Sequence, residues 1–514
     1  MTEESRNSPL PAQHVSTGIA GLDDILHGGF LRDRVYLIYG QPGTGKTTLA
    51  MQYLLACQSR GEAVLYVTLS ETAEELHGMA ASHGWSLQQV NLCDLSAAED
   101  TLKADAQYSV FHPSDVELGE TTTAILSEIE RVKPAHVVFD GISEIRLLAR
   151  DPLRYRRQML ALKQYFANKH ITVLFLDDHA TPLGDIPPES VVSGVLILEK
   201  IAPAYGVSRR RLIVSKARGQ TFRDGYHDYE IKTGGLHVYP RLVAAEHHSE
   251  GSIDPLVSQV TGLDALLMGG LDAGTTTLLL GPAGVGKSTV ALQYVVSALT
   301  QGHRAAVYSF DEVLDTLFYR ADKLLGGLRQ YVDTGLLQVA QVDPAELSPG
   351  AFSYEVRQAV EQRGVKVVVI DSLNGYCNSM LDEQFIETHL HELFAYLDQQ
   401  KVVTLVTMVQ HGIIGSMKAS IDISYLSDTV VLFRYYEAVG EIHQAISVIK
   451  RRRGPHERTL RELRISSQGI IVGEPLRQFA GLMTGVPQYS GGSAQLGMTA
   501  GSSEQRSQDR QDPI

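Results

Sequence analysis

Cysteine is scarce in this sequence, and long apolar runs are missing. The 514 residues include Cys57, Cys93 and Cys377, which are scattered and lack a C-x-x-C spacing. This pattern argues against a disulfide framework or a zinc knuckle and favours a reducing compartment. The first sixteen residues lack the apolar run of a signal peptide, and no apolar stretch approaches the ~20 residues that span a bilayer. We therefore expect a cytoplasmic protein with no membrane segment.

Positive charge is also in deficit. The chain has 45 Lys and Arg residues against 59 Asp and Glu residues, which gives a formal net charge of −14. This balance argues against a broad electrostatic grip on nucleic acid, although it leaves room for a local contact. Hydrophobic residues make up 44% of the chain, an ordinary globular composition. The length is sufficient for two domains, each with its own core.

Two segments, residues 40–47 (GQPGTGKT) and 281–288 (GPAGVGKS), match the phosphate-loop pattern G-x-x-x-x-G-K-[ST]. In such a loop the glycines let backbone N–H groups surround the phosphates, the lysine reaches the outer phosphates, and the hydroxyl holds Mg²⁺. The pattern therefore predicts two nucleoside triphosphate sites. The expected nucleotide-binding residues are Gly43, Thr44, Gly45, Lys46, Thr47 and Thr48 in the first site and Gly284, Val285, Gly286, Lys287, Ser288 and Thr289 in the second.

The two loops belong to a longer repeat. Gly21 and Gly262, like Lys46 and Lys287, are 241 residues apart, a spacing that indicates duplication of a whole domain. Nearly continuous Val, Ile and Leu runs alternate with helical stretches, as in parallel sheets covered by helices. We predict two tandem α/β domains, each a mainly parallel sheet flanked by helices. The expected parts are a polar segment 1–15, a first domain 16–243, a linker 244–256, a second domain 257–476 and a C-terminal segment 477–514.

About 90 residues after each loop, an apolar run ends in one aspartate. Asp140 ends the run VVFD, and Asp371 ends the run VVID. Because a triphosphate site uses a carboxylate at the end of a buried strand to hold Mg²⁺, we expect Asp140 to act with Thr47 and Asp371 with Ser288. An apolar run ending in Asp is also a common strand end, so the pattern has weight only beside the loops.

A second acidic position follows the next predicted strand. The offset of the repeat places Glu71 on Glu312 and Ser70 on Asp311. We predict that Glu71, Asp311 and Glu312 are catalytic, because hydrolysis needs a base or a group that positions water. The alternative is a carboxylate that caps a helix start near Thr72.

These features together resemble the KaiC family of ATPases, over residues 15–489. The marks are the entry T-G-x-x-G-L-D-x-x-L-x-G-G, the two phosphate loops, the acidic residues after the next strand, and the segment SHGW at residues 82–85. The resemblance implies two RecA-like P-loop domains, ATP and Mg²⁺ as ligands, and Ser82 at the ATP site. It also implies a homohexameric ring with ATP between subunits, regulatory partners of the KaiB type, and Asp311 near magnesium as well as in catalysis. Ser70 departs from the family's acidic pair.

The resemblance also assigns cations that reach ATP from the neighbouring subunit. Its K-x-R pattern corresponds to Lys216, Ala217 and Arg218 in the first domain. In the second domain it corresponds to residues 450–452, Lys450, Arg451 and Arg452, where the register is ambiguous by one residue. The alternative is a solvated basic strand end. Because an arginine acting in trans can be worth ~10³-fold in rate, activity would then depend on ring assembly.

The family's second domain also phosphorylates itself, and the matching positions here are Ser424 and Tyr425. Tyrosine replaces the second hydroxyl residue of the family, and Ser424 could equally cap a turn. The segment 477–514 resembles the part that regulates the autokinase, and it ends in a low-complexity tail. We thus expect an ATP-hydrolysing ring protein with serine/threonine autokinase activity that acts as a clock-like switch. The alternatives are a recombinase- or helicase-type ATPase and a scaffold in which ATP is structural.

Overall fold

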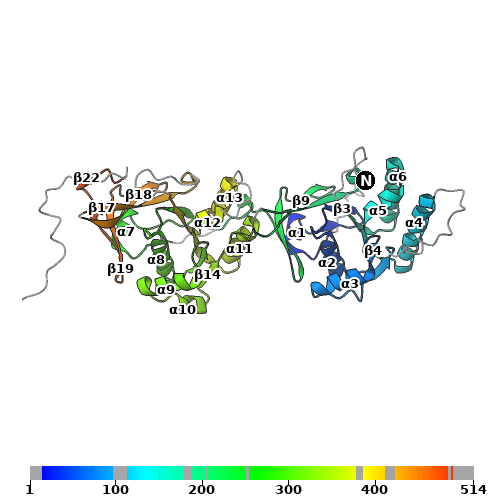
Figure 1. The fold of residues 1–514 in the computed structure, drawn as a ribbon, viewed down its shortest axis with the longest axis horizontal. Helices are drawn as coiled ribbons and strands as arrows, with labels where there is room; N and C mark the ends of the chain where they lie inside the picture. The colour runs from blue at the N-terminus through cyan, green and yellow to red at the C-terminus, as the bar shows by residue number, and fades with distance from the viewer. Residues whose placement is uncertain are drawn as a thin grey trace, which may run out of the picture. The chain divides into compact units, whose positions relative to one another are not determined.

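The computed structural model has two large sheets, one in each of two compact units (Figure 1). It describes residues 14–96, 113–149, 151–178, 188–203, 206–249, 254–377, 386–410, 423–438, 440–483 and 488–489. The first unit comprises Met1–Leu242 with Ala345–Glu355, and the second comprises Val243–Pro344 with Val356–Ile514. Each unit is described by itself below.

The first unit is built on a nine-stranded sheet in the order β11-β10-β9-β8-β3-β7-β6-β4-β5. Strands β8, β3, β7, β6, β4 and β5 run parallel, and β9, β10 and β11 extend the sheet antiparallel. In chain order the strands are β3 (Val35–Gly40), β4 (Val64–Thr68), β5 (Asn91–Asp94), β6 (His136–Asp140), β7 (Thr172–Asp177), β8 (Gly194–Ile201), β9 (Arg209–Ala217), β10 (His227–Lys232) and β11 (Gly235–Tyr239). A short pair, β1 (His14–Val15) and β2 (Phe30–Leu31), precedes them.

Helices cover both faces of this sheet. Consecutive residues of the central strand point to opposite sides, so that Leu37 packs in one hydrophobic cluster and Ile38 in the other. This two-sided burial explains why the strand reads as a continuous apolar run. The helical elements are α1 (Ala20–Ile25), α2 (Lys46–Ser59), α3 (Ala73–Ser82), α4 (Pro113–Val132), α5 (Ile142–Ala149), α6 (Pro152–Asn168) and η2 (Pro188–Ser190).

The second unit repeats the plan, with the strand order β14-β13-β15-β16-β12-β17-β18-β19-β20. The strands are β12 (Thr275–Gly281), β13 (Arg304–Ser309), β14 (Leu337–Gln341), β15 (Val365–Asp371), β16 (Val403–Val409), β17 (Thr429–Ala438), β18 (Glu441–Arg451), β19 (Arg461–Ser466), β20 (Gly469–Pro475), β21 (Phe479–Ala480) and β22 (Gln488–Tyr489). The helices are η3 (Ala244–Glu246), α7 (Thr261–Leu266), α8 (Lys287–Thr300), α9 (Leu314–Leu325), α10 (Arg329–Asp333), α11 (Pro349–Glu361), α12 (Leu373–Cys377) and α13 (Ile386–Gln399). Contact grouping divides α11 between the two units.

Strand register makes the two sheets directly comparable. Thr68 on β4 lies level with Asp140 on β6, and Ser309 on β13 lies level with Asp371 on β15. The predicted fold class is therefore confirmed: each domain is a mainly parallel sheet flanked by helices. None of the helices in the described ranges is long and apolar enough to cross a membrane.

A buried histidine ties the antiparallel edge of the first sheet to the loop before it. The Nδ1 atom of His227 accepts a hydrogen bond from the Arg241 backbone N–H (2.8 Å), and Nε2 donates to the Arg223 carbonyl (3.0 Å). Only a neutral ring can accept at Nδ1 and donate at Nε2. Burial is the main reason that the pKa of His227 falls to about 4, and the two neighbouring arginines lower it further.

We expect acid to destabilise the first unit through this residue. Because the folded pKa lies below the unfolded value of about 6.5, the stabilisation is complete above pH 6.5 and is lost as the pH falls toward 4. Between pH 7 and pH 5 the loss should be about 2 kcal/mol. Trp85 is the chain's single tryptophan, so its fluorescence during urea unfolding at each pH reports on this unit.

In His227→Gln, the free energy of unfolding should fall by about 2 kcal/mol less between pH 7 and pH 5 than in wild type, whatever the stability of the variant at pH 7. His237→Gln is the matched control, because His237 is exposed on the adjacent strand β11 and should leave the pH dependence unchanged. Equal pH dependence in wild type and His227→Gln would contradict the assignment.

Candidate functional site

The first phosphate loop joins the central strand β3 to helix α2. Gly43 (φ 79°) and Gly45 (φ 96°) adopt left-handed backbone conformations that favour glycine. Gly45 immediately precedes the first residue of α2, so the loop delivers its backbone N–H groups to the N-terminus of a 14-residue helix. Thr44 is fully buried below the loop, and its hydroxyl donates to the Gln41 carbonyl (2.8 Å). This geometry suits an anionic phosphate.

Lys46 is nearly buried, and its Nζ atom donates to the Gln41 carbonyl (3.4 Å) in addition to two closer partners. Its Nζ atom donates to the Gly40 carbonyl (2.7 Å) and to Asp178 Oδ1 (2.6 Å). Asp178 follows the end of β7, the strand next to β3, and its side chain is 51% exposed. The carboxylate therefore takes up one of the hydrogen-bonding positions of the Lys46 ammonium.

A hydroxyl and a carboxylate meet beside this lysine. The Thr47 hydroxyl donates to Asp140 Oδ2 (3.2 Å), and the Tyr66 hydroxyl also donates to Asp140. Burial raises the pKa of Asp140, because the charged form loses its hydration. A divalent cation would offset that cost, and an all-oxygen donor set is the kind that Mg²⁺ prefers. Thr47 and Asp140 therefore fit a magnesium site.

The second phosphate loop has the same backbone, and its lysine keeps the two carbonyl contacts of Lys46 without the ion pair to a carboxylate. Gly284 (φ 76°) and Gly286 (φ 103°) again precede a 14-residue helix, α8. Lys287 donates to the carbonyls of Gly281 (2.9 Å) and Pro282 (2.7 Å). Burial lowers the pKa of Lys287 to about 8, a shift that nearby Asp371 and Asp311 oppose. The remaining predicted residues of this loop are Val285, which is fully buried, Ser288, and Thr289 in the first turn of α8.

The residue of the second domain that is equivalent to Asp178 is uncharged. Register places Asp177 beside Tyr39, and Met408 beside Leu280, the repeat equivalent of Tyr39. Val409 therefore stands where the first domain has Asp178. Lys46 has a carboxylate partner at this level, whereas Lys287 relies on backbone carbonyls.

The acidic residues lie in equivalent turns after β4 and β13. The Thr68 hydroxyl donates to the Glu71 carbonyl (2.6 Å), and the Ser309 hydroxyl donates to the Glu312 carbonyl (2.7 Å). Glu71 forms no hydrogen bond or ion pair through its carboxylate with any residue in the described ranges. Burial raises the pKa of Glu71, and the Asp140 carboxylate raises it further.

Glu71 is not the residue that caps the helix after it. Thr72 is the N-cap of α3, and it forms a reciprocal capping box with Glu75. In the second domain the N-cap is Val313, which has no side-chain cap. The alternative role predicted for this acidic position thus belongs to Thr72 and Glu75 in the first domain.

Both carboxylates of the second acidic pair have partners. The Ser372 hydroxyl donates to Asp311 Oδ2, and Arg320 forms an ion pair with Glu312 Oε2 (2.6 Å). The Thr407 hydroxyl donates to Asp371, at the end of the neighbouring strand β15. The negative charges of Asp371 and Asp311 both raise the pKa of Lys287, against the larger lowering effect of burial.

The basic segments lie at the ends of equivalent strands. Lys216 pairs with Val195 on β8, and Lys450 pairs with Val430 on β17. Val195 and Val430 are equivalent, because the residues before them, Gly194 and Thr429, pair with equivalent residues of the central strands β3 and β12. Register therefore sets Lys450 level with Lys216 and Arg452 level with Arg218. Each lysine donates to two carbonyls of the preceding loop: Lys216 to Glu189 and Val192, and Lys450 to Ser424 and Ser427.

Neighbouring cations differ between the two segments. Burial lowers the pKa of Lys216, and Arg218 and Lys163 lower it further, so three positive side chains gather there. Arg451 is nearly buried and forms an ion pair with Asp272 (3.0 Å), whereas Ala217 stands at the equivalent level. Arg452 is half exposed and donates to the Tyr425 carbonyl.

The predicted phosphorylation positions lie in a turn before β17. Ser424 is half-buried, and Tyr425 is exposed with its hydroxyl donating to Glu387 (2.8 Å). Lys450 and Arg452 hold the backbone carbonyls of this turn. The acceptor positions and the basic strand end therefore form one surface of the second unit.

Three further predictions fall at the margins of the site. Ser82 ends α3, and its hydroxyl donates to the Met79 carbonyl (2.7 Å). Thr48 is nearly buried in the first turn of α2. In the C-terminal segment, β21 pairs with β22, and residues 484–487 and 490–514 lie outside the described ranges.

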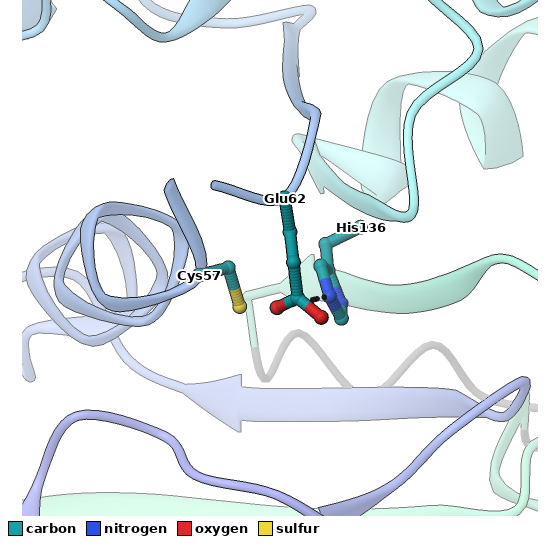
Figure 2. A group of neighbouring side chains, drawn as sticks. All are labelled: Cys57, Glu62 and His136. Atoms are coloured by element: carbon teal, nitrogen blue, oxygen red, sulfur yellow. Dashed lines mark hydrogen bonds and ion pairs between the residues drawn. The ribbon is translucent and has the colours of Figure 1, made fainter. Parts of the chain in front are cut away.

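One group of metal-ligand residue types lies away from the phosphate loop (Figure 2). Atoms of Cys57 on α2, Glu62 and His136 on β6 lie within 4.8 Å of one another. Glu62 forms ion pairs with Arg32 and with Arg60 Nε (3.4 Å), and Arg60 also donates to Cys57 Sγ (3.1 Å). Two guanidinium groups beside the carboxylate oppose a further cation, and burial raises the pKa of the Cys57 thiol to about 12. We assign the group to a polar network that joins α2 to β6.

Sequence reasoning missed two charged residues at the sites, Asp178 and Arg320. A signal for Asp178 was present, because it follows an apolar run that ends beside the loop strand, as Asp140 does. No comparable signal marked Arg320, which is one of several cations on an exposed helix.

Comparison with known proteins agrees with the geometry. The family model described as the KaiC ATPase matches residues 15–243 and 256–477. A circadian clock protein KaiC3 of Synechocystis is 24% identical over 484 residues, which cover 93% of this chain and 95% of that protein. The circadian clock oscillator protein KaiC of Parathermosynechococcus lividus is 26% identical, covering 95% of this chain and 92% of that protein. That of Thermosynechococcus vestitus is also 26% identical, covering 94% and 93%.

We expect Asp178→Asn to tighten nucleotide binding at the first site. A phosphate that binds Lys46 would compete with the Asp178 carboxylate, and an ion pair this exposed is worth about 0.2–1 kcal/mol, or up to roughly fivefold in Kd. Titration of a fluorescent ATP analogue into a Lys287→Ala background isolates this site.

The matched control is Val409→Asp in a Lys46→Ala background, which adds a carboxylate at the equivalent level of the second site. It should weaken binding there by a similar factor. Weaker nucleotide binding in Asp178→Asn would show that the carboxylate helps to hold the nucleotide.

Proposed function

This chain belongs to the KaiC family of ATPases, and from that premise we propose that it is an ATP-hydrolysing ring protein whose second domain phosphorylates its own chain. The observation that carries the hydrolytic part is the arrangement of Lys46, Thr47, Asp140 and Glu71 around one phosphate loop. Lys46 is suited to bind the phosphates, and Thr47 and Asp140 are suited to hold Mg²⁺. Glu71 is suited to accept the proton that water loses in hydrolysis.

In the first domain the loop N–H groups and Lys46 would bind the phosphates, and Thr47 with Asp140 would hold Mg²⁺. The ion neutralises charge on the phosphate oxygens when it is bound. Glu71 is half-buried and its carboxylate is not engaged by another described side chain. A raised pKa makes a carboxylate a better proton acceptor, so Glu71 is suited to take a proton from the attacking water.

Assembly is part of the proposal. Lys163, Lys216 and Arg218 place three positive side chains near one strand end: besides burial, Arg218 lowers the pKa of both lysines and Lys163 lowers that of Lys216, which Glu189 opposes. Such a cluster is costly unless an anion is near. We propose that in a homohexamer Lys216, Ala217 and Arg218 meet the triphosphate of the adjacent subunit, and that Lys450, Arg451 and Arg452 do so in the second domain. An arginine in trans would then couple hydrolysis to ring formation.

The kinase part rests on the turn that carries Ser424 and Tyr425. Lys450 and Arg452 tie this turn to the strand end that would face a neighbour's triphosphate. We propose that Ser424 is the acceptor, and that Asp311, beside the phosphate loop, receives its proton. Tyr425 is held by Glu387 and is the less available hydroxyl. The named relatives are circadian clock proteins, which supports a clock-like switching role with a KaiB-type partner.

Phosphate release tests the hydrolytic role. Lys46→Ala should abolish release from the first site, and Glu71→Gln should lower it by about 10²-fold, the usual worth of a general base. Both are measured with Mg-ATP in a Lys287→Ala background. Glu74→Gln is the matched control, because Glu74 is an exposed carboxylate on α3 and should release phosphate at the wild-type rate. Measurable release that is unchanged in Glu71→Gln would contradict the role of Glu71, and negligible release from both proteins would favour a scaffold in which ATP is structural.

Radiolabel transfer tests the kinase role. With γ-labelled ATP and Mg²⁺, wild type and Tyr425→Phe should incorporate label, and Ser424→Ala and Lys287→Ala should not. Mapping the labelled peptide by mass spectrometry identifies the acceptor. Wild-type protein that hydrolyses ATP without acquiring label would remove the kinase and leave the ATPase.

A further inference from the structure

The two acidic turns have the same backbone and different partners. Glu71 and Glu312 are held through their carbonyls by the equivalent residues Thr68 and Ser309. Eight residues later, on the helix that follows each turn, the first domain has Met79 and the second has Arg320. Met79 packs against the hydrophobic core, whereas Arg320 turns back to the acidic residue.

Arg320 holds Glu312 on the side of helix α9. Its Nη2 atom donates to Glu312 Oε2 (2.6 Å), and both side chains are about three-quarters buried (28% and 24% exposed). Its Nη1 atom lies 3.5 Å from the hydroxyl of Thr289, in the first turn of the phosphate-loop helix α8. The guanidinium therefore bridges the acidic turn and the loop helix, and Glu312 is anchored at both its backbone and its carboxylate.

The neighbouring carboxylate is arranged differently as well. Asp311 accepts from Ser372, whereas the first domain has Ser70 and Gly141 at the equivalent positions. A Cβ atom on Gly141 would stand 3.1 Å from the Ser70 hydroxyl oxygen. Among the described residues, the Glu71 carboxylate of the first site has no hydrogen-bond or ion-pair partner, whereas Asp311 and Glu312 of the second site are both engaged.

We propose that Arg320 is a positioning residue that keeps Glu312 from serving as a proton acceptor for water. This inference rests on the proposed function and deepens it. In hydrolysis a water oxygen bonds to the γ-phosphorus, the bond to the bridging oxygen of ADP breaks, and the water's proton passes to a carboxylate. Taking that proton would neutralise Glu312 and remove the negative charge that strengthens its hydrogen bond to Arg320, a charge-assisted bond and thus among the stronger kinds.

The consequence is that the second site hydrolyses its ATP slowly. Asp311 keeps its place beside Lys287, where it can accept a proton from a hydroxyl held in position. Water, which relies on a carboxylate free to turn toward it, is disfavoured. Restraint of Glu312 thereby shifts the second site from hydrolysis toward phosphoryl transfer, and the unrestrained Glu71 leaves hydrolysis to the first site.

The test is a double-mutant cycle on full-length protein with Lys46→Ala, which silences the first site. Arg320→Met gives the second domain the side chain that the first domain has. It should raise kcat for phosphate release about tenfold, a change of about 1.4 kcal/mol in activation free energy, with little change in KM for ATP. Arg320→Lys, which retains a cation, should keep most of the restraint.

The gain should depend on Glu312. In a Glu312→Gln background, Arg320→Met should change kcat by less than about twofold, because the restrained group is gone. Lys323→Met is the matched control: it removes an exposed cation from the same helix, whose contact is with Tyr319, and should leave kcat unchanged.

Two outcomes would overturn the inference. One is a rate that stays the same or falls in Arg320→Met, which would make Arg320 neutral or an aid to catalysis. The other is a gain that persists in Glu312→Gln, which would place the effect elsewhere. Failure of the proposed function is distinct, because it would appear as absence of phosphate release from the unsubstituted chain with both loops intact.

Discussion

Each phosphate loop must keep a lysine ammonium almost out of water, at 8% exposure for Lys46 and 6% for Lys287, and the rest of each site depends on how that charge is balanced. Burial of a cation is costly unless it is paired or hydrogen-bonded. Both lysines donate to two backbone carbonyls; Lys46 has the carboxylate of Asp178 as well, whereas Lys287 has a lowered pKa. One requirement, inherited by both halves of the chain, is therefore met in two chemically different ways, and a triphosphate meets a different competitor at each site.

The scaffold that imposes this requirement was predictable from the sequence. Continuous apolar runs indicated strands buried on both faces, and the loop pattern fixed the strand-to-helix turn at Lys46 and Lys287. The position of Asp140 beside Thr47 also followed, because the carboxyl ends of neighbouring parallel strands meet at one edge. In each of these cases local sequence and sheet topology determine the neighbour without knowledge of side-chain conformation.

The contacts that distinguish the sites could not be predicted in this way. The Lys46–Asp178 pair joins residues far apart in sequence through strand order, and Arg320 reaches Glu312 by choosing one direction for a long side chain. The register of Lys450 was ambiguous because residues 450–453 are all basic; a bulge between Val430 and Val431, like that between Val195 and Leu196 in the first domain, shifts the pairing of β17 with β18. A bulge changes which residue faces which partner, and nothing in the run of basic residues signals it.

Two of the differences between the halves lie at positions that touch one another. Ser70 and Gly141 are replaced by Asp311 and Ser372, and the new hydroxyl donates to the new carboxylate. A carboxylate added beside a glycine would have gained no such donor, and a serine added beside Ser70 would have crowded its hydroxyl. Since contacting substitutions are coupled in free energy, these changes are best understood as one unit. Arg320 belongs to the same unit, because it balances the second of two adjacent carboxylates that the first site does not have.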